Sequence, residues 1–265
     1  MKIKEIIHER ENFAPLKLQE SYDNSGVQVG DTTREVVGVL LCVDVTEAVL
    51  EEAIEKNCNL IISHHPLIFS GIKKIIPDNS IGKIIFKAIE NHITIYSSHT
   101  NMDKAPKGVS YQTAAKLGVI VEKPLVPEKE DERFGLGIIG ELPEKMKMVD
   151  FLEKTKKILN LGNIRHSEIP QDKTVKKIAL CGGSAFEFYK EAIAAGADLY
   201  LTADIKYHQY FEPENRIILA DIGHYESEQF VKEIFYDIVS GLNSKINAKF
   251  ALLFSERPSN PINYL

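Results

Sequence analysis

The segment VGVLLCVDVTEAVLEEAIEKNCNLIISHH, residues 37–65, decides the fold of this chain of 265 residues. An apolar run at 36–43 predicts a strand, and a second run at 59–63 predicts a strand that is buried on both faces. Between them, residues 46–57 place apolar side chains at helical spacing, and the segment opens with Thr46, a residue type that caps helix N-termini. Strand, helix and strand in this order indicate an α/β protein.

The same alternation continues along the chain. Further strands are predicted at 93–98, 134–142, 175–181, 197–202 and 216–223, and further helices at 79–92, 108–118, 148–160, 186–196 and 225–242. The charged segment 121–133 contains two prolines, so we predict a linker there.

An internal repeat is visible when the two parts of the chain are aligned. Residues 37–65 align without a gap with residues 176–204, with six of 29 positions identical, and residues 93–103 align with 217–228. We interpret this pattern as a duplication. It predicts two related three-layer α/β/α halves with mixed sheets and a cleft between them at the C-terminal ends of the strands.

The predicted first half is 1–124 and the predicted second half is 125–265. Within the second half, residues 223–265 are expected to return His224 and Glu228 to the shared cleft.

Histidines and carboxylates follow three of the predicted strands. His64 and His65 come directly after the strand at 59–63, and His99 and His224 each follow another strand. In α/β proteins, ligands bind outside the carboxyl ends of the strands. Because the chain must turn at Pro66, two successive rings can reach one site.

The last two histidines each have a carboxylate four residues later. These pairs are His99 with Asp103 and His224 with Glu228. Residues four apart share one face of a helix, so His224 and Glu228 can hold one ion, whereas we predict a loop for the first pair.

Imidazoles and carboxylates without thiolates suit zinc, iron, manganese or nickel. Two adjacent histidines, a third histidine and two carboxylates exceed the three protein ligands of a catalytic zinc. They suit two divalent ions about 3.5–4 Å apart, so we predict that the cleft between the halves is a metal cleft.

Each of these motifs also has an interpretation without a bound ion. Taken alone, the SHHP run is typical of a turn, and HxxxE on a helix is typical of a solvated face. It is their position after successive strands of a repeated scaffold that favours metal. His8, His92 and His166 are interpreted as structural, while His208 is expected to line the cleft without binding metal.

Composition argues against several classes of protein. The formal net charge is −6, and the lysines alternate with glutamates, so no basic stripe suits a nucleic acid. The apolar runs are far too short to cross a membrane, and the N-terminus lacks a signal-peptide core. Three cysteines without CxxC spacing indicate reduced, buried thiols in a cytoplasmic protein.

Two glycine motifs resemble nucleotide-binding signatures. Gly135, Gly137 and Gly140 match GxGxxG, but a charged segment precedes them and Pro143 follows, so we place them in or beside a strand. The Gly182–Gly183 pair lies at a strand-to-helix turn that is able to cradle a phosphate, although a tight turn is the favoured explanation.

Several motifs in order resemble those of the NGG-one-interacting-factor-three-like, dinuclear-metal-centre proteins, also known as GTP cyclohydrolase I type 2 homologues. These motifs are YDNSGVQVG (22–30), LIISHHPLIF (60–69), SSHTNMD (97–103), GLGIIGEL (135–142), ALCGGSA (179–185), LTADIKYHQ (201–209) and GHYESE (223–228). Together they cover nearly the whole chain.

The resemblance implies a metal pair, with Glu228 as the bridge between the ions and His99 as a further histidine of the cleft. The ligands that it implies are His64, His65, Asp103, His224 and Glu228. It also implies a toroidal hexamer and hydrolysis of the purine ring of GTP. This chain departs from the family at 202–204, where TAD replaces TGE or TGD, and at 107–110, and we expect neither stretch to touch a ligand.

Two functions of different classes remain open. One is a metal-dependent hydrolase acting on a small molecule, with His99 or His208 moving protons. The other is a protein that binds metal or partners without catalysis, since the same five ligands serve both.

Overall fold

The computed structural model describes residues 1–246 and 249–265 and divides the chain into two compact units. The first unit comprises residues 1–102 and 231–261, and the second comprises 103–230 and 262–265. The chain therefore leaves the first unit and later returns to it. Each unit has its own sheet and its own apolar core.

The first unit contains a five-stranded sheet in the order β1-β4-β3-β2-β11. The strands are β1 (Gly26–Val29), β2 (Gly38–Leu41), β3 (Leu60–Ser63), β4 (Thr94–Ser97) and β11 (Ala251–Phe254). The four strands β11, β2, β3 and β4 are parallel, and β1 pairs antiparallel with β4.

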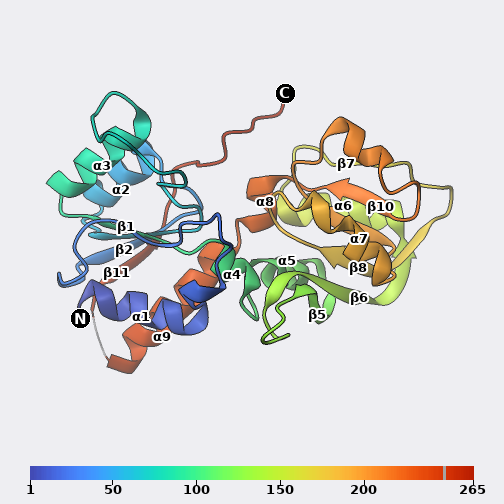
Figure 1. Ribbon diagram of the computed structural model, residues 1–265, viewed down its shortest axis with the longest axis horizontal. Coiled ribbons are helices and arrows are strands. Elements are labelled where there is room, and N and C mark those ends of the chain that lie inside the picture. Colours follow the sequence, from blue (N-terminus) through green and yellow to red (C-terminus); the bar gives the residue numbers. More distant parts are fainter. Residues whose placement is uncertain (247–248) are drawn as a thin grey trace. The chain divides into compact units, whose positions relative to one another are not determined.

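Helices cover both faces of this sheet. They are α1 (Ile3–Phe13), α2 (Glu47–Glu55), α3 (Ser80–Glu90) and α9 (Val231–Ile246), and a short 3₁₀ turn η1 (Leu16–Leu18) follows α1. Helices α2 and α3 lie on one face, and α1 and α9 lie on the other (Figure 1). Helix α2 begins where predicted, because the Thr46 hydroxyl accepts a hydrogen bond from the backbone amide of Val49.

The second unit contains a six-stranded mixed sheet in the order β5-β6-β8-β9-β10-β7. Its strands are β5 (Ile120–Pro127), β6 (Gly135–Lys147), β7 (Arg165–His166), β8 (Thr174–Leu180), β9 (Leu199–Thr202) and β10 (Ile218–Asp221). Its helices are α5 (Val109–Leu117), α6 (Met148–Leu159), α7 (Tyr189–Ala194) and α8 (His224–Glu228), with 3₁₀ turns η2 (Phe186–Phe188) and η3 (Tyr207–Phe211).

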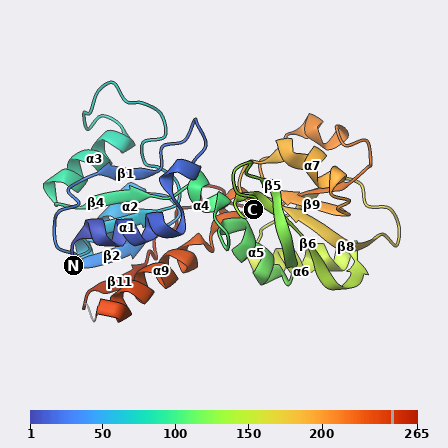
Figure 2. The ribbon, with the colours of Figure 1, turned by 60° about the horizontal axis from the view of Figure 1, so that its bottom comes forward.

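Strand β9 shows how this sheet separates two cores. Leu199 and Leu201 pack into the core shared with α5 and α6, while Tyr200 packs into the core shared with η2 and α7. Successive side chains of β9 enter opposite cores because side chains alternate between the two faces of a strand. Figure 2 shows α5 and α6 on one face of the sheet and α7 on the other.

Both units contain the same strand pattern. In the first, β2, β3 and β4 are parallel neighbours, with antiparallel β1 beside β4. In the second, β8, β9 and β10 are parallel neighbours, with antiparallel β7 beside β10. The alignment of 37–65 with 176–204 places β2 on β8 and β3 on β9, so the sheets agree with the repeat.

The prediction of a mixed α/β fold with two mixed sheets is confirmed. The predicted linker at 121–133 is wrong, because β5 occupies most of it and pairs antiparallel with β6. The predicted helix at 225–242 is two helices, since α8 ends at Glu228 and α9 begins at Val231. The loop predicted after His99 is a short helix, α4 (Thr100–Lys104).

The remaining expectations concern membranes and thiols. Over the described residues, the chain forms no helix of the length and apolarity that crossing a bilayer requires. Cys42, Cys58 and Cys181 are all buried and free of disulfides. Burial raises the pKa of the Cys58 thiol to about 11.

Candidate metal centre

Three histidines of the first unit meet at the ends of two neighbouring parallel strands. His64 and His65 follow β3, and His99 follows β4; we call these residues the histidine cluster. The backbone amides of His64 and His65 both donate to the carbonyl of Val43, at 3.0 Å each. The chain therefore turns where the sequence predicted, and successive rings lie together instead of on opposite faces.

The rings of the histidine cluster are close neighbours. Their centroids lie 5.0 Å apart for His64 and His65, 5.2 Å for His64 and His99, and 5.4 Å for His65 and His99. One nitrogen from each ring lies within 4.8 Å of the others, so this group could hold a metal ion. His64 is fully buried.

Each ring of the histidine cluster is oriented through its Nδ1 atom. His64 Nδ1 lies 2.9 Å from the carbonyl oxygen of Ser98, and His65 Nδ1 lies 2.6 Å from Asp44. His99 Nδ1 lies 2.8 Å from Asp23. These oxygens accept, so each Nδ1 carries the proton and each Nε2 carries the lone pair that a metal would use. Metal-binding histidines commonly have such partners.

Asp23 is the most constrained of these acceptors. Besides His99, its carboxylate accepts the backbone amides of Asn24 at 2.7 Å and Thr100 at 3.0 Å. The Thr100 and Ser25 hydroxyls also donate to it. Burial alone would raise the pKa of Asp23, but the hydrogen bonds outweigh it and hold that pKa well below its usual value. Asp23 is therefore an anion that fixes the His99 ring.

The second unit brings together another histidine and two carboxylates. His224 Nδ1 lies 2.7 Å from Asp204, and His224 Nε2 lies 3.4 Å from Glu228, four residues further along α8. Burial would lower the pKa of His224, but hydrogen bonds to Asp204 and Glu228 raise it to about 11. This environment strongly favours positive charge at His224, either a proton on Nε2 or, in its place, a metal ion.

The loop after β8 packs closely against the side chain of Glu228. A Cβ atom at Gly183 would clash with the Glu228 carboxylate, and Gly183 has a φ of +67°. Only glycine fits both the backbone and the space here. The amides of Gly182 and Gly183 donate to the hydroxyls of Ser110 and Ser227. Because these amides already have acceptors, the Gly182–Gly183 turn is explained without a phosphate.

The charges of Asp103 and Glu228 affect the pKa of the Cys181 thiol in this unit. Burial, and then the negative charges of Asp103 and Glu228, raise the pKa of the Cys181 thiol well above its ordinary value. None of the candidate metal-binding groups among the described residues contains a cysteine, so the donors are oxygen and nitrogen.

Three acidic residues that orient the histidines were missed from the sequence. Asp44 lies shortly after β2, the strand that pairs with β3. Its position after a strand was therefore a signal that could have identified it from the sequence. Asp23 lies within the quoted motif 22–30. The expectation that 202–204 touches no candidate ligand is wrong, because Asp204 bonds to His224.

His208 lies in η3, where its side chain is exposed and its ring packs 5.1 Å from that of Tyr207. Among the residues that the structure describes, His208 therefore has neither the burial nor the carboxylate partner that distinguish His99.

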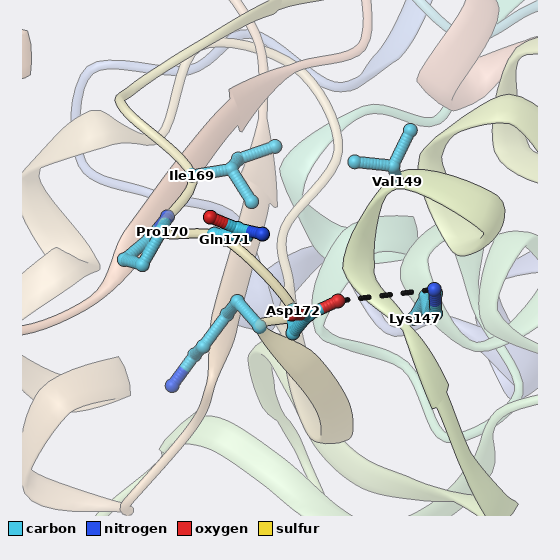
Figure 3. A pocket seen from close by; sticks show the side chains of 7 residues that line it. Lys147, Val149, Ile169, Pro170, Gln171 and Asp172 are labelled. Carbon is cyan, nitrogen blue, oxygen red and sulfur yellow. Dashed lines mark ion pairs between the residues drawn. The ribbon is translucent and has the colours of Figure 1, made fainter.

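A cavity of about 290 Å³ in the second unit contains none of the predicted ligands. It is lined by Lys147, Val149, Ile169, Pro170, Gln171, Asp172 and Lys173. Lys147 and Asp172 face each other across it at 3.9 Å (Figure 3). Both of these side chains are exposed, so the feature is a crevice in the surface with a solvated ion pair.

Comparison with known proteins shows to which family the chain belongs. The family model described as Duf34/NIF3 (NGG1p interacting factor 3) matches residues 1–261. A Clostridium acetobutylicum protein named GTP cyclohydrolase 1 type 2 homolog is 32% identical, covering 100% of this chain and 99% of that protein.

Two solved structures have the same architecture. The Staphylococcus aureus hypothetical protein SA1388 is 28% identical with a TM-score of 0.92, covering 100% of this chain and 99% of that one. A Bacillus cereus protein related to NIF3 is 25% identical with a TM-score of 0.91 and the same coverage. The chain described here therefore belongs to the Duf34/NIF3 family.

Proposed function

We propose that the chain binds two divalent metal ions and uses them to hydrolyse a small-molecule substrate. The proposed ligands are His64, His65, Asp103, His224 and Glu228. The observation that carries the proposal is the orientation of His64, His65 and His224, each of which bonds through Nδ1 to an oxygen acceptor. This arrangement selects the tautomer and ring direction that metal binding needs.

The donor set fits divalent ions of intermediate softness. Imidazole and carboxylate donors suit zinc, iron, manganese and nickel, whereas calcium and magnesium prefer oxygen alone. When bound, such ions polarise a substrate oxygen and make a nucleophilic water available near neutral pH.

His99 is the residue that we propose for proton transfer. Its Nδ1 proton is held by the Asp23 carboxylate, so the Nε2 atom is the one able to take up a proton. Its side chain is 16% exposed, which leaves it accessible while its direction is fixed. His208 was predicted for the same role, but His99 is the stronger candidate because it has an orienting partner.

GTP is the substrate that the names of the relatives suggest, and we rank it below hydrolysis of a small molecule in general. The described residues include no GxxxxGK[ST] loop, and the amides of Gly182 and Gly183 already donate to serines. A triphosphate would depend on scattered lysines such as Lys73, Lys74 and Lys107.

The test begins with metal content. Elemental analysis of protein prepared with and without oxygen should find about two ions per chain, and the variant His64→Ala, His65→Ala should lose metal. Zinc, iron and manganese forms are then incubated with GTP and with a panel of phosphate esters, amides and cyclic amidines. Formate is measured in the GTP reaction.

Formate above the level of the His64→Ala, His65→Ala control would support GTP opening. Turnover of another substrate would support hydrolysis in general. Metal binding without turnover of any substrate would contradict the hydrolase and favour the alternative, a non-catalytic metal-binding or partner-binding protein.

Assembly into a ring-shaped homohexamer is part of this proposal. Support comes from large apolar side chains that the first unit exposes between β3 and the end of α3, including Phe69, Ile75 and Ile89, which are 49%, 49% and 56% exposed. Contiguous exposed apolar patches commonly mark protein interfaces. Light scattering coupled to gel filtration should give six times the chain mass, and a monomeric mass would contradict the ring.

A further inference from the structure

The histidine cluster has features of a metal site in its own right. All three of its residues lie in the first unit, at the ends of adjacent strands β3 and β4. Three histidines that leave a fourth position open form a known ligand set of catalytic zinc. Here one nitrogen from each of the three rings lies within 4.8 Å of the others.

His99 is held for this role as firmly as His64 and His65. Its Nδ1 bonds to a fully buried carboxylate, that of Asp23, at 2.8 Å. Its backbone amide donates to Ser25 at 3.2 Å, and the same Ser25 hydroxyl donates to Asp23. Ring and backbone are thus fixed by one network.

The bonding of the Nδ1 atoms decides which nitrogens face the ion. All three Nδ1 atoms donate to oxygen acceptors, namely the Ser98 carbonyl, Asp44 and Asp23. The three lone pairs therefore lie on Nε2 atoms. Two of the acceptors are carboxylates, which raise the basicity of the rings they bond and strengthen their bonds to a metal.

We propose that His64, His65 and His99 form a three-histidine site that binds one nitrogen-preferring divalent cation, such as zinc or cobalt, without ligands from residues 103–230. The proposal rests on the proposed metal binding by His64 and His65, and it adds His99 as a direct ligand when one ion is bound. Asp23 and Asp44 act as positioning residues for this site.

The experiment uses the full chain with His224→Ala and Glu228→Ala, which removes two of the ligands proposed outside the cluster. Cobalt is titrated, and its visible absorption reports both stoichiometry and coordination number. Zinc affinity is measured by competition with a chromophoric chelator. Into this background we introduce His99→Ala and, as a matched control, His8→Ala, which removes an exposed histidine from α1.

The background should bind one cobalt ion with the intense absorption of four-coordinate cobalt. His99→Ala should weaken zinc binding at least tenfold and lower the cobalt absorption, whereas His8→Ala should change neither. Asp23→Asn, which keeps His99 but removes its charged partner, should weaken zinc binding by about tenfold or more. If His99→Ala fails to fold, as judged by circular dichroism, His99→Gln repeats the test with a side chain of similar size.

Equal zinc affinity for the His99 variant and the His8 control would overturn the three-histidine site. Failure of the background to bind one ion would also overturn it, provided that the unmodified chain does bind metal. An unmodified chain that binds no divalent ion would instead overturn the proposed function, so the two failures are distinguishable.

Discussion

The Nδ1 atom of His99 lies 2.8 Å from Oδ1 of Asp23, and this bond joins residues 76 positions apart in the sequence. The Asp23 side chain is fully buried and anionic, with donors from His99, Asn24, Ser25 and Thr100. It ties the segment before β1 to the end of β4.

Replacing this carboxylate should therefore destabilise the first unit. Asp23→Asn places an amide NH₂ where several donors converge, so we expect the free energy of unfolding to fall by about 2–4 kcal/mol. Urea denaturation followed by circular dichroism measures it. Asp31→Asn is the matched control, because Asp31 also bonds to a residue two positions away but is exposed. Equal urea midpoints for the two variants would contradict the prediction.

Glu52 should make stability depend on pH in the acid range. Its buried carboxylate accepts bonds from Lys56 at 2.8 Å, from the Ser255 hydroxyl at 2.5 Å and from the Glu256 amide at 3.0 Å. Burial alone would raise its pKa, but these bonds lower the pKa of Glu52 to about 2. Since the folded-state pKa lies below the unfolded one, the carboxylate stabilises the fold above about pH 4.5 and loses this effect as the pH falls toward 2.

Glu52→Gln should consequently lower the free energy of unfolding at pH 7 by about 1–3 kcal/mol. The difference from the unmodified chain should shrink as the pH is lowered through 4.5. Thermal unfolding at a series of pH values measures both effects. Glu51→Gln, on the exposed side of α2, should leave the melting temperature nearly unchanged. A Glu52→Gln effect that is constant from pH 7 to pH 3 would show that the charge is not responsible.

Gly183 and Gly196 offer a matched pair of glycines. Both have positive φ, +67° and +74°, so alanine is strained at either. A Cβ at Gly196 has nothing within 4 Å, whereas one at Gly183 would clash with Glu228. Gly196→Ala should cost about 1 kcal/mol, and Gly183→Ala should cost at least about 1 kcal/mol more.

Gly183→Ala should also weaken zinc binding, because it displaces a proposed ligand, while Gly196→Ala should not. Urea denaturation and chelator competition give the two quantities. Equal effects of the two alanines on both quantities would mean that the Glu228 contact is unimportant.

Arg10 carries a buried charge that forms no ion pair with an acidic side chain among the described residues. Its guanidinium lies 3.8 Å from the centroid of the Phe235 ring, and within the described parts of the chain its three side-chain nitrogens have no hydrogen-bond acceptor. Burial lowers the pKa of Arg10 to about 10. The folded state therefore disfavours this cation, and the cost is present at pH 7 and relieved only as the pH rises beyond 10.

Arg10→Met should keep the packing between α1 and α9 while removing the charge. We expect the free energy of unfolding at pH 7 to stay the same or rise by up to about 2 kcal/mol. Urea denaturation tests this, with Phe235→Leu as the variant that removes the aromatic ring but keeps the charge. A loss of more than about 2 kcal/mol for Arg10→Met would show that the ring face stabilises the cation more than burial opposes it.

Local patterns in the sequence were sufficient for most of the elements. The run 36–43 and the run 59–63 contain β2 and β3, and Thr46 caps α2 as predicted. The turn that brings His64 and His65 together was also predictable, because Pro66 follows them. These features depend on neighbours within a few residues, which is the distance over which side-chain periodicity and capping operate.

Two predictions from local sequence patterns were wrong. Residues 121–133 resemble a linker in composition, yet β5 forms there because β6 supplies hydrogen-bond partners along its length. The helical period of 225–242 continues across a break between α8 and α9, and those helices belong to different units. Periodicity does not show which core each turn of a helix joins.

The sequence by itself determined the α/β class, the repeated strand–helix–strand pattern and the candidate histidines and carboxylates. Only the tertiary structure decided which acids orient those histidines: Asp23 for His99, Asp44 for His65 and Asp204 for His224, across 76, 21 and 20 residues. Each pairing depends on which strands become neighbours in a sheet. Strand order is set by packing of the whole unit, and no local pattern encodes it.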